Sequence, residues 1–200
     1  MQTAAIRLSS THRQRGLTAV ELLVTLAILA ILIGIAAPSM SRFIGQWRAS
    51  NAVNALTGSL RTARTEAIAR ARPVVVCRVA SNSSTTCLST AGTNGFASGW
   101  IVFVNNDRDT SFDYSATNGD ELLLRQEAPL GITNIALTNA GRFVFLPNGL
   151  LNAAANGIDI DAAGFNSVST TPWLRKALCI TKPGRIRSVA SSANCGDNEG

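Results

Sequence analysis

The chain has 200 residues, of which 46% are hydrophobic and 15% charged, which is enough for one ordinary domain with an appendage. The net charge is +6 at pH 7, but three arginines lie in the first 16 residues, and the +3 that remains without them is too small to establish a polyanionic partner. The single histidine, His12, lies in the same segment, so the rest of the chain lacks the imidazole needed for Ser-His or Cys-His catalysis and for histidine metal sites.

A long apolar run follows this basic opening. Residues 17–37, LTAVELLVTLAILAILIGIAA, contain one charge, Glu21, and as a helix they would be about 30 Å long, the thickness of a bilayer core. The run is too long, and starts too soon after Gly16, for an ordinary secretory signal peptide. A carboxylate in a membrane helix costs roughly 3 kcal/mol, which exceeds the gain of under about 1 kcal/mol from the helix dipole. We therefore expect Glu21 to meet a cationic or hydrogen-bond-donating partner.

The opening of the chain resembles the class III signal of type IV pilins and pseudopilins. The resemblance rests on a short basic leader ending in Gly16, on Glu21 as the fifth residue after it, and on Pro38 as the twenty-second. It implies that a prepilin peptidase cuts between Gly16 and Leu17 and methylates the new amino terminus. It also implies that Glu21 meets the N-terminal amine of a neighbouring subunit during assembly. Leu17 departs from the phenylalanine that the family usually has at this position.

The helix is expected to continue beyond Pro38, which should kink rather than end it, and to stop before Pro73. Residues 38–72 keep apolar and small side chains at spacings of three and four, which predicts an amphipathic helix. These side chains are Phe43, Trp47, Val53, Leu56, Leu60, Ala63 and Ala67. The outer face carries Arg42, Arg48, Arg61, Arg64, Arg70 and Arg72. We interpret this row as a solvated helix face, with a secondary contact to polyanions left open.

From Pro73 onward, short runs rich in Val, Ile, Leu and Phe alternate with turn-forming residues, which predicts an antiparallel sheet or sandwich. The predicted strands lie in PVVVCRV, GWIVFVN, ELLLRQE, ITNIALT and GRFVFLP. Residues 105–121 hold five acids but lack the ligand order of an EF-hand, so we interpret them as an acidic surface loop and expect no metal and no cofactor. GxGxxG, GxxxxGK[ST] and GxSxG are absent, and no acid/base pair is identifiable, so we expect no catalytic residues and no enzyme.

The four cysteines form two pairs that are local in the sequence, and neither has the spacing of a zinc knuckle. They are Cys77, Cys87, Cys179 and Cys195. Two disulfides formed in an oxidising compartment are the better interpretation. Four cysteines permit more than one connectivity, so the sequence leaves the pairing open. A bond between Cys179 and Cys195 would tether the segment between them.

That segment belongs to a basic stretch, residues 173–189, which contains five cations and no acid. The cations are Arg175, Lys176, Lys182, Arg185 and Arg187. The sequence KPG at 182–184 predicts a turn. In an extended segment Arg185 and Arg187 point to one side while Ile186 points to the other. Two guanidinium groups on one side suit phosphate oxygens, which they can bind without reading bases.

The order of these segments resembles the FimT/GspH branch of the pilins. The resemblance covers residues 16–187 and rests on SLRTARTEAIARARPVVVC, SGWIVFVNNDRD, ELLLRQE, FLPNG and RKALCITKPGRIR. It implies an α+β, type IV pilin-like fold, in which a long N-terminal helix with a transmembrane half and an amphipathic half packs on an antiparallel two-sheet β-domain. The expected parts are a leader peptide at 1–16, a transmembrane and assembly helix at 17–37, its amphipathic continuation at 38–72, and a globular β-domain with a basic C-terminal loop at 73–200.

Within this branch, Gly184, Arg185 and Arg187 match the GRxR pattern of FimT-like DNA receptors. The match implies sequence-independent binding of double-stranded DNA by these residues, and we expect Lys182, Arg175 and Lys176 to assist. Without the resemblance, the turn could simply keep the domain soluble or pair with the acidic loop of a neighbouring subunit.

The expected function is that of a minor type IV pilin for DNA uptake in natural transformation. Such a protein would cross the bacterial inner membrane once, with its globular domain in the periplasm, and would assemble with other pilin subunits into a pilus at the cell surface. The alternative is a GspH-like minor pseudopilin of a type II secretion system with a purely structural role. In that case the basic turn would meet protein partners.

Overall fold

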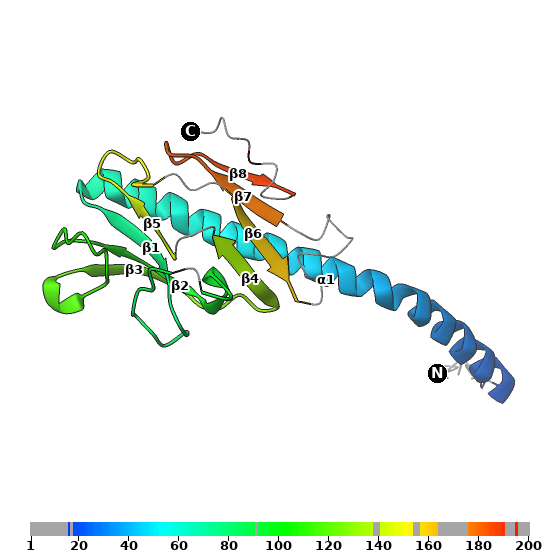
Figure 1. Cartoon of the computed structure of the whole chain (residues 1–200). Coiled ribbons are helices and arrows are strands. Elements are labelled where there is room, and N and C mark those ends of the chain that lie inside the picture. The colour runs from blue at the N-terminus through cyan, green and yellow to red at the C-terminus, as the bar shows by residue number, and fades with distance from the viewer. Residues whose placement is uncertain are drawn as a thin grey trace, which may run out of the picture. The chain divides into compact units, whose positions relative to one another are not determined.

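The structure is a computed structural model that describes residues 16, 18–90, 92–137, 141–153, 157–163, 176–190 and 195. It divides into two compact units, Met1–Met40 and Ser41–Gly200. The helix α1 (Ala19–Arg70) includes Pro38 and does not end there, as predicted (Figure 1). The predicted α+β fold, with a long N-terminal helix and two antiparallel sheets, is confirmed.

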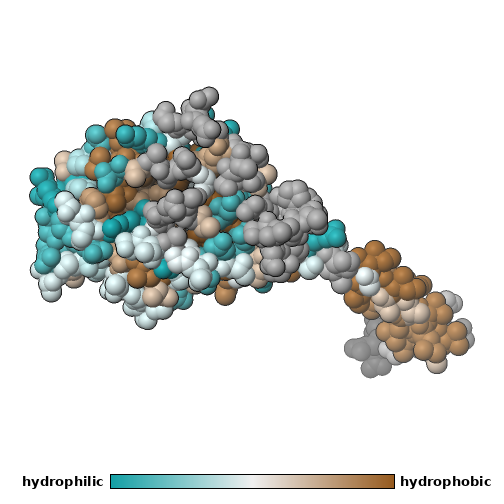
Figure 2. Space-filling view, viewed as in Figure 1, coloured by the Kyte–Doolittle hydropathy of each residue, from teal (hydrophilic) through white to brown (hydrophobic). Residues whose placement is uncertain are grey.

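The described part of the first unit is apolar over its surface. Residues 19–36 have a mean hydropathy of 2.7, and none of this segment is buried within the chain. Figure 2 shows this part of the molecule as a hydrophobic surface. Apolar surface exposed to water costs about 25 cal/mol per Å², so this segment is far more stable in an apolar environment. Among the described residues, this is one helix that is long and apolar enough to cross a bilayer.

The second unit contains two four-stranded sheets whose neighbouring strands are all antiparallel. The first sheet has the order β3-β2-β1-β5, with β1 (Val74–Arg78), β2 (Trp100–Val104), β3 (Glu121–Gln126) and β5 (Arg142–Phe145). The second has the order β4-β6-β7-β8, with β4 (Ile132–Leu137), β6 (Gly157–Ala162), β7 (Lys176–Ile180) and β8 (Ile186–Val189). Two short 3-10 helices, η1 (Phe96–Ser98) and η2 (Ala116–Asn118), precede β2 and β3.

The five runs that predicted strands form β1 to β5, whereas β6, β7 and β8 were not predicted. Strand β6 shows why, because its sequence GIDIDA places aspartates, which are rare in strands, between its apolar residues. Ile158 and Ile160 are fully buried in the core, and Asp161 is buried as well. Apolar residues do occur at every second position of β6, but the aspartates between them make the segment unlike a typical strand sequence.

The main core lies where α1 meets both sheets. Five of the predicted apolar helix positions are buried in it, namely Val53, Leu56, Leu60, Ala63 and Ala67. Phe43 and Trp47 are instead 63% and 61% exposed, so the prediction is wrong for these two. The reason is that the core shared with the sheets begins only at Ala52. A buried hydrogen bond, from Trp100 Nε1 to Ser59 Oγ at 2.9 Å, fixes the helix on β2.

The end of α1 is a Schellman motif. The amide of Arg72 donates to the carbonyl of Ala67 at 3.3 Å, and the amide of Ala71 donates to Ile68 at 3.4 Å. Ala71 has a φ of 50°, the left-handed conformation that glycine usually supplies at this position. Pro73 follows and cannot continue the helix. The helix therefore ends at Arg70, slightly before the predicted boundary.

Candidate functional site

The basic segment singled out in the sequence forms a β-hairpin from β7 and β8. Cys179 pairs with Arg187, and Ile180 with Ile186. In the connecting turn, the amide of Thr181 donates to Arg185 O at 3.0 Å and the amide of Gly184 donates to Thr181 O at 2.8 Å. The amide of Arg185 donates to Thr181 Oγ1 at 3.1 Å. The predicted turn at 182–184 is therefore confirmed, and hydrogen bonds close it on both sides.

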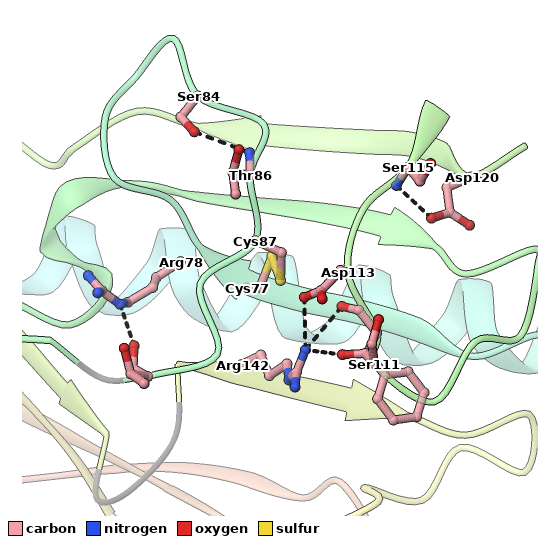
Figure 3. Close-up of a disulfide and its surroundings, with 12 residues drawn as sticks. Cys77, Arg78, Ser84, Thr86, Cys87, Ser111, Asp113, Ser115, Asp120 and Arg142 are labelled. Atoms are coloured by element: carbon pink, nitrogen blue, oxygen red, sulfur yellow. Dashed lines mark hydrogen bonds and ion pairs between the residues drawn. A yellow bond between two sulfur atoms is a disulfide. The ribbon is translucent and has the colours of Figure 1, made fainter. Parts of the chain in front are cut away.

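A disulfide tethers the same hairpin. Cys179, within β7, is bonded to Cys195, and their Cα atoms are 5.4 Å apart. The other disulfide joins Cys77 in β1 to Cys87 (Figure 3). Each bond joins the partners that are local in the sequence, a pairing that the sequence had left open.

The side chains of the hairpin alternate between solvent and core. Arg185 and Arg187 are exposed, whereas Ile186 between them is half-buried and packs against the main core. Lys182 is exposed in the turn, and Lys176, at the start of β7, is half-buried. The alternation of the two arginines and Ile186 is as predicted. Arg175 lies outside the described residues.

Gly184 is held closely against α1. It is buried, with a φ of 77°, and a Cβ atom at this position would lie 3.1 Å from both Cδ and Nε of Arg64. Arg64 Nη1 donates to the carbonyl of Gly184 at 3.4 Å. The backbone conformation and the neighbouring side chain both favour glycine here. The glycine of the GRxR pattern thus shapes the turn, while the arginines remain exposed.

A groove of about 370 Å³ lies between this turn and α1. Its lining residues are Arg61, Arg64, Thr65, Gly184, Arg185 and Ile186. Figure 1 shows the β7–β8 hairpin beside α1, which agrees with the Arg64–Gly184 hydrogen bond. Among the described residues, three arginines and no carboxylate line the groove. The groove therefore has a positive potential and suits an anion.

Arg64 is the least solvated of these cations. Its Nε atom is buried and has no hydrogen-bond partner within the described part of the chain. A buried N–H without a partner costs roughly 1–3 kcal/mol. The unpaired Nε atom of Arg64 thus costs stability, while the Nη1 atom of the same side chain donates to the turn that precedes Arg185.

The helix arginines of this groove were not singled out as site residues by the sequence. Arg61 and Arg64 belong to the row that we interpreted as a solvated helix face. Their spacing of three places them on one face, but the turn that meets them is about 120 residues later in the chain. No pattern within either segment indicates this contact.

Not every arginine of the row is available to a ligand. Arg70 donates from Nε to Glu66 at 2.6 Å and from Nη1 to Glu121 at 2.5 Å. These hydrogen bonds, first that to Glu121 and then that to Glu66, raise the pKa of the Arg70 guanidinium above its usual value. Two carboxylates therefore compensate its charge.

Three carboxylates of the acidic loop at 105–121, those of Asp107, Asp109 and Asp120, accept hydrogen bonds within the loop, whereas Glu121 bonds to Arg70 on α1. Asp120 accepts hydrogen bonds from the amides of Asn106 and Ser115, both at 2.9 Å. Asp109 accepts from the amide of Phe112 at 2.9 Å. In the described ranges, no cluster of three or more metal-binding side chains occurs. These carboxylates shape the loop, as is usual for acids in turns.

Arg142 fastens this loop to β5. Its Nη1 atom donates to the carbonyls of Ser111 and Phe112 and lies 3.3 Å from Asp113 Oδ1 (Figure 3). The same view shows the Cys77–Cys87 disulfide close by. The acidic loop is therefore anchored on its own sheet.

At the other end of the chain, the predicted processing and assembly residues lie at the start of α1. Gly16 is described and exposed, whereas Leu17 lies outside the described residues. The amide of Glu21 donates to Thr18 Oγ1 at 3.2 Å, a helix N-cap. The Glu21 side chain is exposed and has no ion-pair partner among the described residues. Its carboxylate is accessible to a group outside this chain.

Comparison with known proteins gives two family matches. Residues 52–172 match the family described as type II transport protein GspH, and residues 11–37 match the prokaryotic N-terminal methylation motif. No curated protein sequence matches the chain.

Among solved structures, the chain is similar to the type IV minor pilin FimU of Pseudomonas aeruginosa, which was solved in two crystal forms. The TM-scores are 0.48 and 0.46, at 17% and 16% sequence identity. The alignments cover 80% and 74% of this chain and 98% and 97% of FimU.

Proposed function

The chain belongs to the type II transport protein GspH family, and from that premise we propose that it is a minor type IV pilin that binds double-stranded DNA without sequence preference. The coarser role, a minor type IV pilin or pseudopilin, follows from the family and from the N-terminal methylation motif. The members of this group are structural components of filaments. The finer role depends on the basic hairpin.

One observation carries the proposal. Arg185 and Arg187 are exposed on either side of the half-buried Ile186, on a hairpin that hydrogen bonds and a disulfide hold in place. A guanidinium group can donate two parallel hydrogen bonds to phosphate oxygens, so two exposed arginines on one side of a hairpin suit a phosphate backbone. Little loop entropy is lost on binding, because the backbone beneath them is already ordered.

This arrangement supports binding to the backbone of DNA rather than to base edges. Phosphate contacts determine position and affinity but carry no sequence information. The exposed Lys182 adds a further charge beside the turn. For a pilin that captures DNA of any origin, binding without sequence preference suits uptake in natural transformation.

The proposal also places the protein in the cell. A prepilin peptidase would cut between Gly16 and Leu17 and methylate the new terminus, in agreement with the matched motif at 11–37. The apolar helix would hold the subunit in the bacterial inner membrane with the globular domain in the periplasm. Glu21 would then meet the terminal amine of a neighbouring subunit during assembly into a pilus at the cell surface.

A titration with fluorescent duplex DNA tests the proposed function. The oxidised full-length chain in non-ionic detergent would be compared with Arg185→Gln and Arg187→Gln, and with Arg42→Gln as an exposed arginine elsewhere on α1. Each hairpin variant is expected to weaken binding about ten-fold or more, since hydrogen bonds to charged groups contribute roughly 1.5–3 kcal/mol. Arg42→Gln should bind like the parent. Equal affinity of all four proteins would refute the proposal.

The second candidate is a minor pseudopilin of a type II secretion system, which the GspH family match favours. In that role the hairpin would meet a protein subunit, and the parent chain would have negligible affinity for duplex DNA. Co-purification of the parent chain with the other pseudopilins of a secretion system, lost in Arg185→Gln, would support this alternative.

A further inference from the structure

The groove between α1 and the β7–β8 turn contains a cation that the GRxR pattern does not include. Arg61 is exposed on α1 and lines the groove together with Arg185. The two arginines come from segments more than a hundred residues apart, and only the packing of the hairpin on the helix brings them to one place. The groove therefore has two charged walls, one on the helix and one on the turn.

We propose that this groove is a phosphate-binding subsite, in which Arg61 and Arg185 bind the same phosphate group. The inference rests on the proposed function for the source of that phosphate, which is the DNA backbone. It extends the contact surface from the hairpin onto α1, so that DNA would touch both elements.

The charges of the groove favour an anion as its occupant. Arg61, Arg64 and Arg185 line it, and among the described residues no carboxylate does. The nearest acid along the helix, Glu66, is hydrogen-bonded to Arg70, which Glu121 also contacts. Cations that share a groove repel one another, and a bound phosphate relieves this repulsion.

The floor of the groove is built in advance. Arg64 donates to Gly184 O and lies so close to the glycine that a Cβ atom there would be 3.1 Å from its Cδ and Nε atoms. Thr65 donates its hydroxyl to the carbonyls of Arg61 and Thr62 at 3.1 and 2.9 Å, which occupies its only proton within the helix. The donors that remain for a ligand are thus the guanidinium groups of Arg61 and Arg185, together with those N–H groups of Arg64 that do not bond to Gly184 O.

This geometry separates two kinds of helix arginine. Arg70 is occupied by two carboxylates, and Arg72 donates to Asn106 O at 3.2 Å. Arg61 has no hydrogen bond or ion pair of its side chain to another described residue. Its charge is therefore available to a ligand.

A double-mutant cycle on DNA binding tests whether one phosphate is shared. The oxidised full-length chain in non-ionic detergent would be compared with Arg61→Gln, Arg185→Gln and the double variant, with Arg42→Gln as the helix control. Arg61→Gln is expected to weaken duplex DNA binding about ten-fold. The double variant should bind within about three-fold of the weaker single variant, because its two losses concern one contact. Losses that multiply, or an Arg61→Gln variant that binds like Arg42→Gln, would overturn the inference.

A second measurement keeps this inference separate from the proposed function. Inorganic phosphate would be added to the isotope-labelled chain at constant ionic strength, with chloride as the reference salt, and the amide signals of Thr65, Gly184 and Arg185 followed by NMR. Saturable shifts that are lost in Arg61→Gln and in Arg185→Gln are expected. If these shifts occur in a chain that does not bind DNA, the subsite stands and the DNA function falls. If DNA binds but phosphate produces no more shift than chloride, the function stands and the subsite falls.

Discussion

Gly184 has a φ of 77° and lies against the side chain of Arg64, and both features favour glycine at this position. The residue contributes no charge to the candidate site, yet it determines where Arg185 can point. In the GRxR pattern, the role of the glycine is therefore explained by backbone geometry and packing, and that of the arginines by exposure and charge.

Replacing Gly184 with alanine tests this separation of roles. An L-residue in the left-handed region costs roughly 1–2 kcal/mol, and the new Cβ would also press on Arg64, adding about 1 kcal/mol. Gly119→Ala is the matched control, because Gly119 has a φ of 90° and a Cβ added there would meet no atom within 4 Å. Urea unfolding followed by tryptophan fluorescence should show a larger loss of stability for Gly184→Ala. Equal losses of unfolding free energy in the two variants would mean that the contact with Arg64 does not contribute to the preference for glycine.

The sequence predicted part of this site and missed another part for a definable reason. The alternation of Arg185, Ile186 and Arg187 follows from the period of an extended chain, and it was correct. The contribution of Arg61 and Arg64 depends on where the hairpin packs on α1. That contact is a tertiary fact, which no local pattern encodes.

At the level of elements, the C-terminus of α1 combines regular hydrogen bonding with an unfavourable residue at one position. The Schellman hydrogen bonds are complete, but Ala71 occupies the position that glycine usually fills. Its side chain is exposed, so no packing contact explains the alanine. Pro73 and β1, which begins at Val74, fix the chain directly after the helix. The left-handed conformation of Ala71 is therefore maintained by the structure that follows it.

Ala71→Gly is accordingly expected to stabilise the protein. Relief of the left-handed strain is worth roughly 1–2 kcal/mol, and the added flexibility of glycine in the unfolded chain offsets about 0.5–1 kcal/mol of it. The net gain of about 0.5–1 kcal/mol should raise Tm by a few degrees in thermal unfolding followed by circular dichroism. A lower Tm would show that the left-handed conformation at residue 71 is not strained.

The Cys179–Cys195 disulfide is expected to stabilise the folded chain. It joins residues 16 apart in the sequence, and a cross-link of this span is worth about 3 kcal/mol in the chain-entropy model. The Cys179→Ser/Cys195→Ser variant should therefore unfold with a free energy lower by about 2–4 kcal/mol in urea. The Cys77→Ser/Cys87→Ser variant is the comparison, since it removes the other bond and leaves the hairpin tethered. An unchanged free energy for the first variant would contradict this assignment.

The strands show the same division between local and tertiary information. Strands β1 to β5 are rich in branched and aromatic residues and were predicted from these alone. Strand β6 carries aspartates between buried isoleucines, and β8 begins directly after the turn, with an arginine at its second position. Both become strands because they pair with β7, so the second sheet could be predicted only in its first strand.

At the scale of the whole molecule, the charge is divided between two surfaces. The acidic loop at 105–121 is fastened to β5 by Arg142, and its Asp109 and Asp120 carboxylates accept hydrogen bonds from the loop's own backbone. The groove at the β7–β8 turn has three arginines and no acid among its described lining residues. The net charge of +6 does not reveal this separation of acidic and basic surfaces. The proposal of a polyanionic partner therefore rests on where the charges lie and not on their sum.

The salt dependence of DNA binding tests the central claim most directly. The oxidised full-length chain in non-ionic detergent would be titrated with two fluorescent duplexes of unrelated sequence over a series of salt concentrations. The account predicts equal affinities for the two duplexes. It also predicts a log–log slope that falls by about 0.9 for each phosphate neutralised, so that Lys182, Arg185 and Arg187 together give a slope of about −2.7. Replacing Arg185 should reduce the slope by about one. Absence of DNA binding by the folded chain, or an affinity that depends on sequence but not on salt, would contradict the account and favour the secretion pseudopilin.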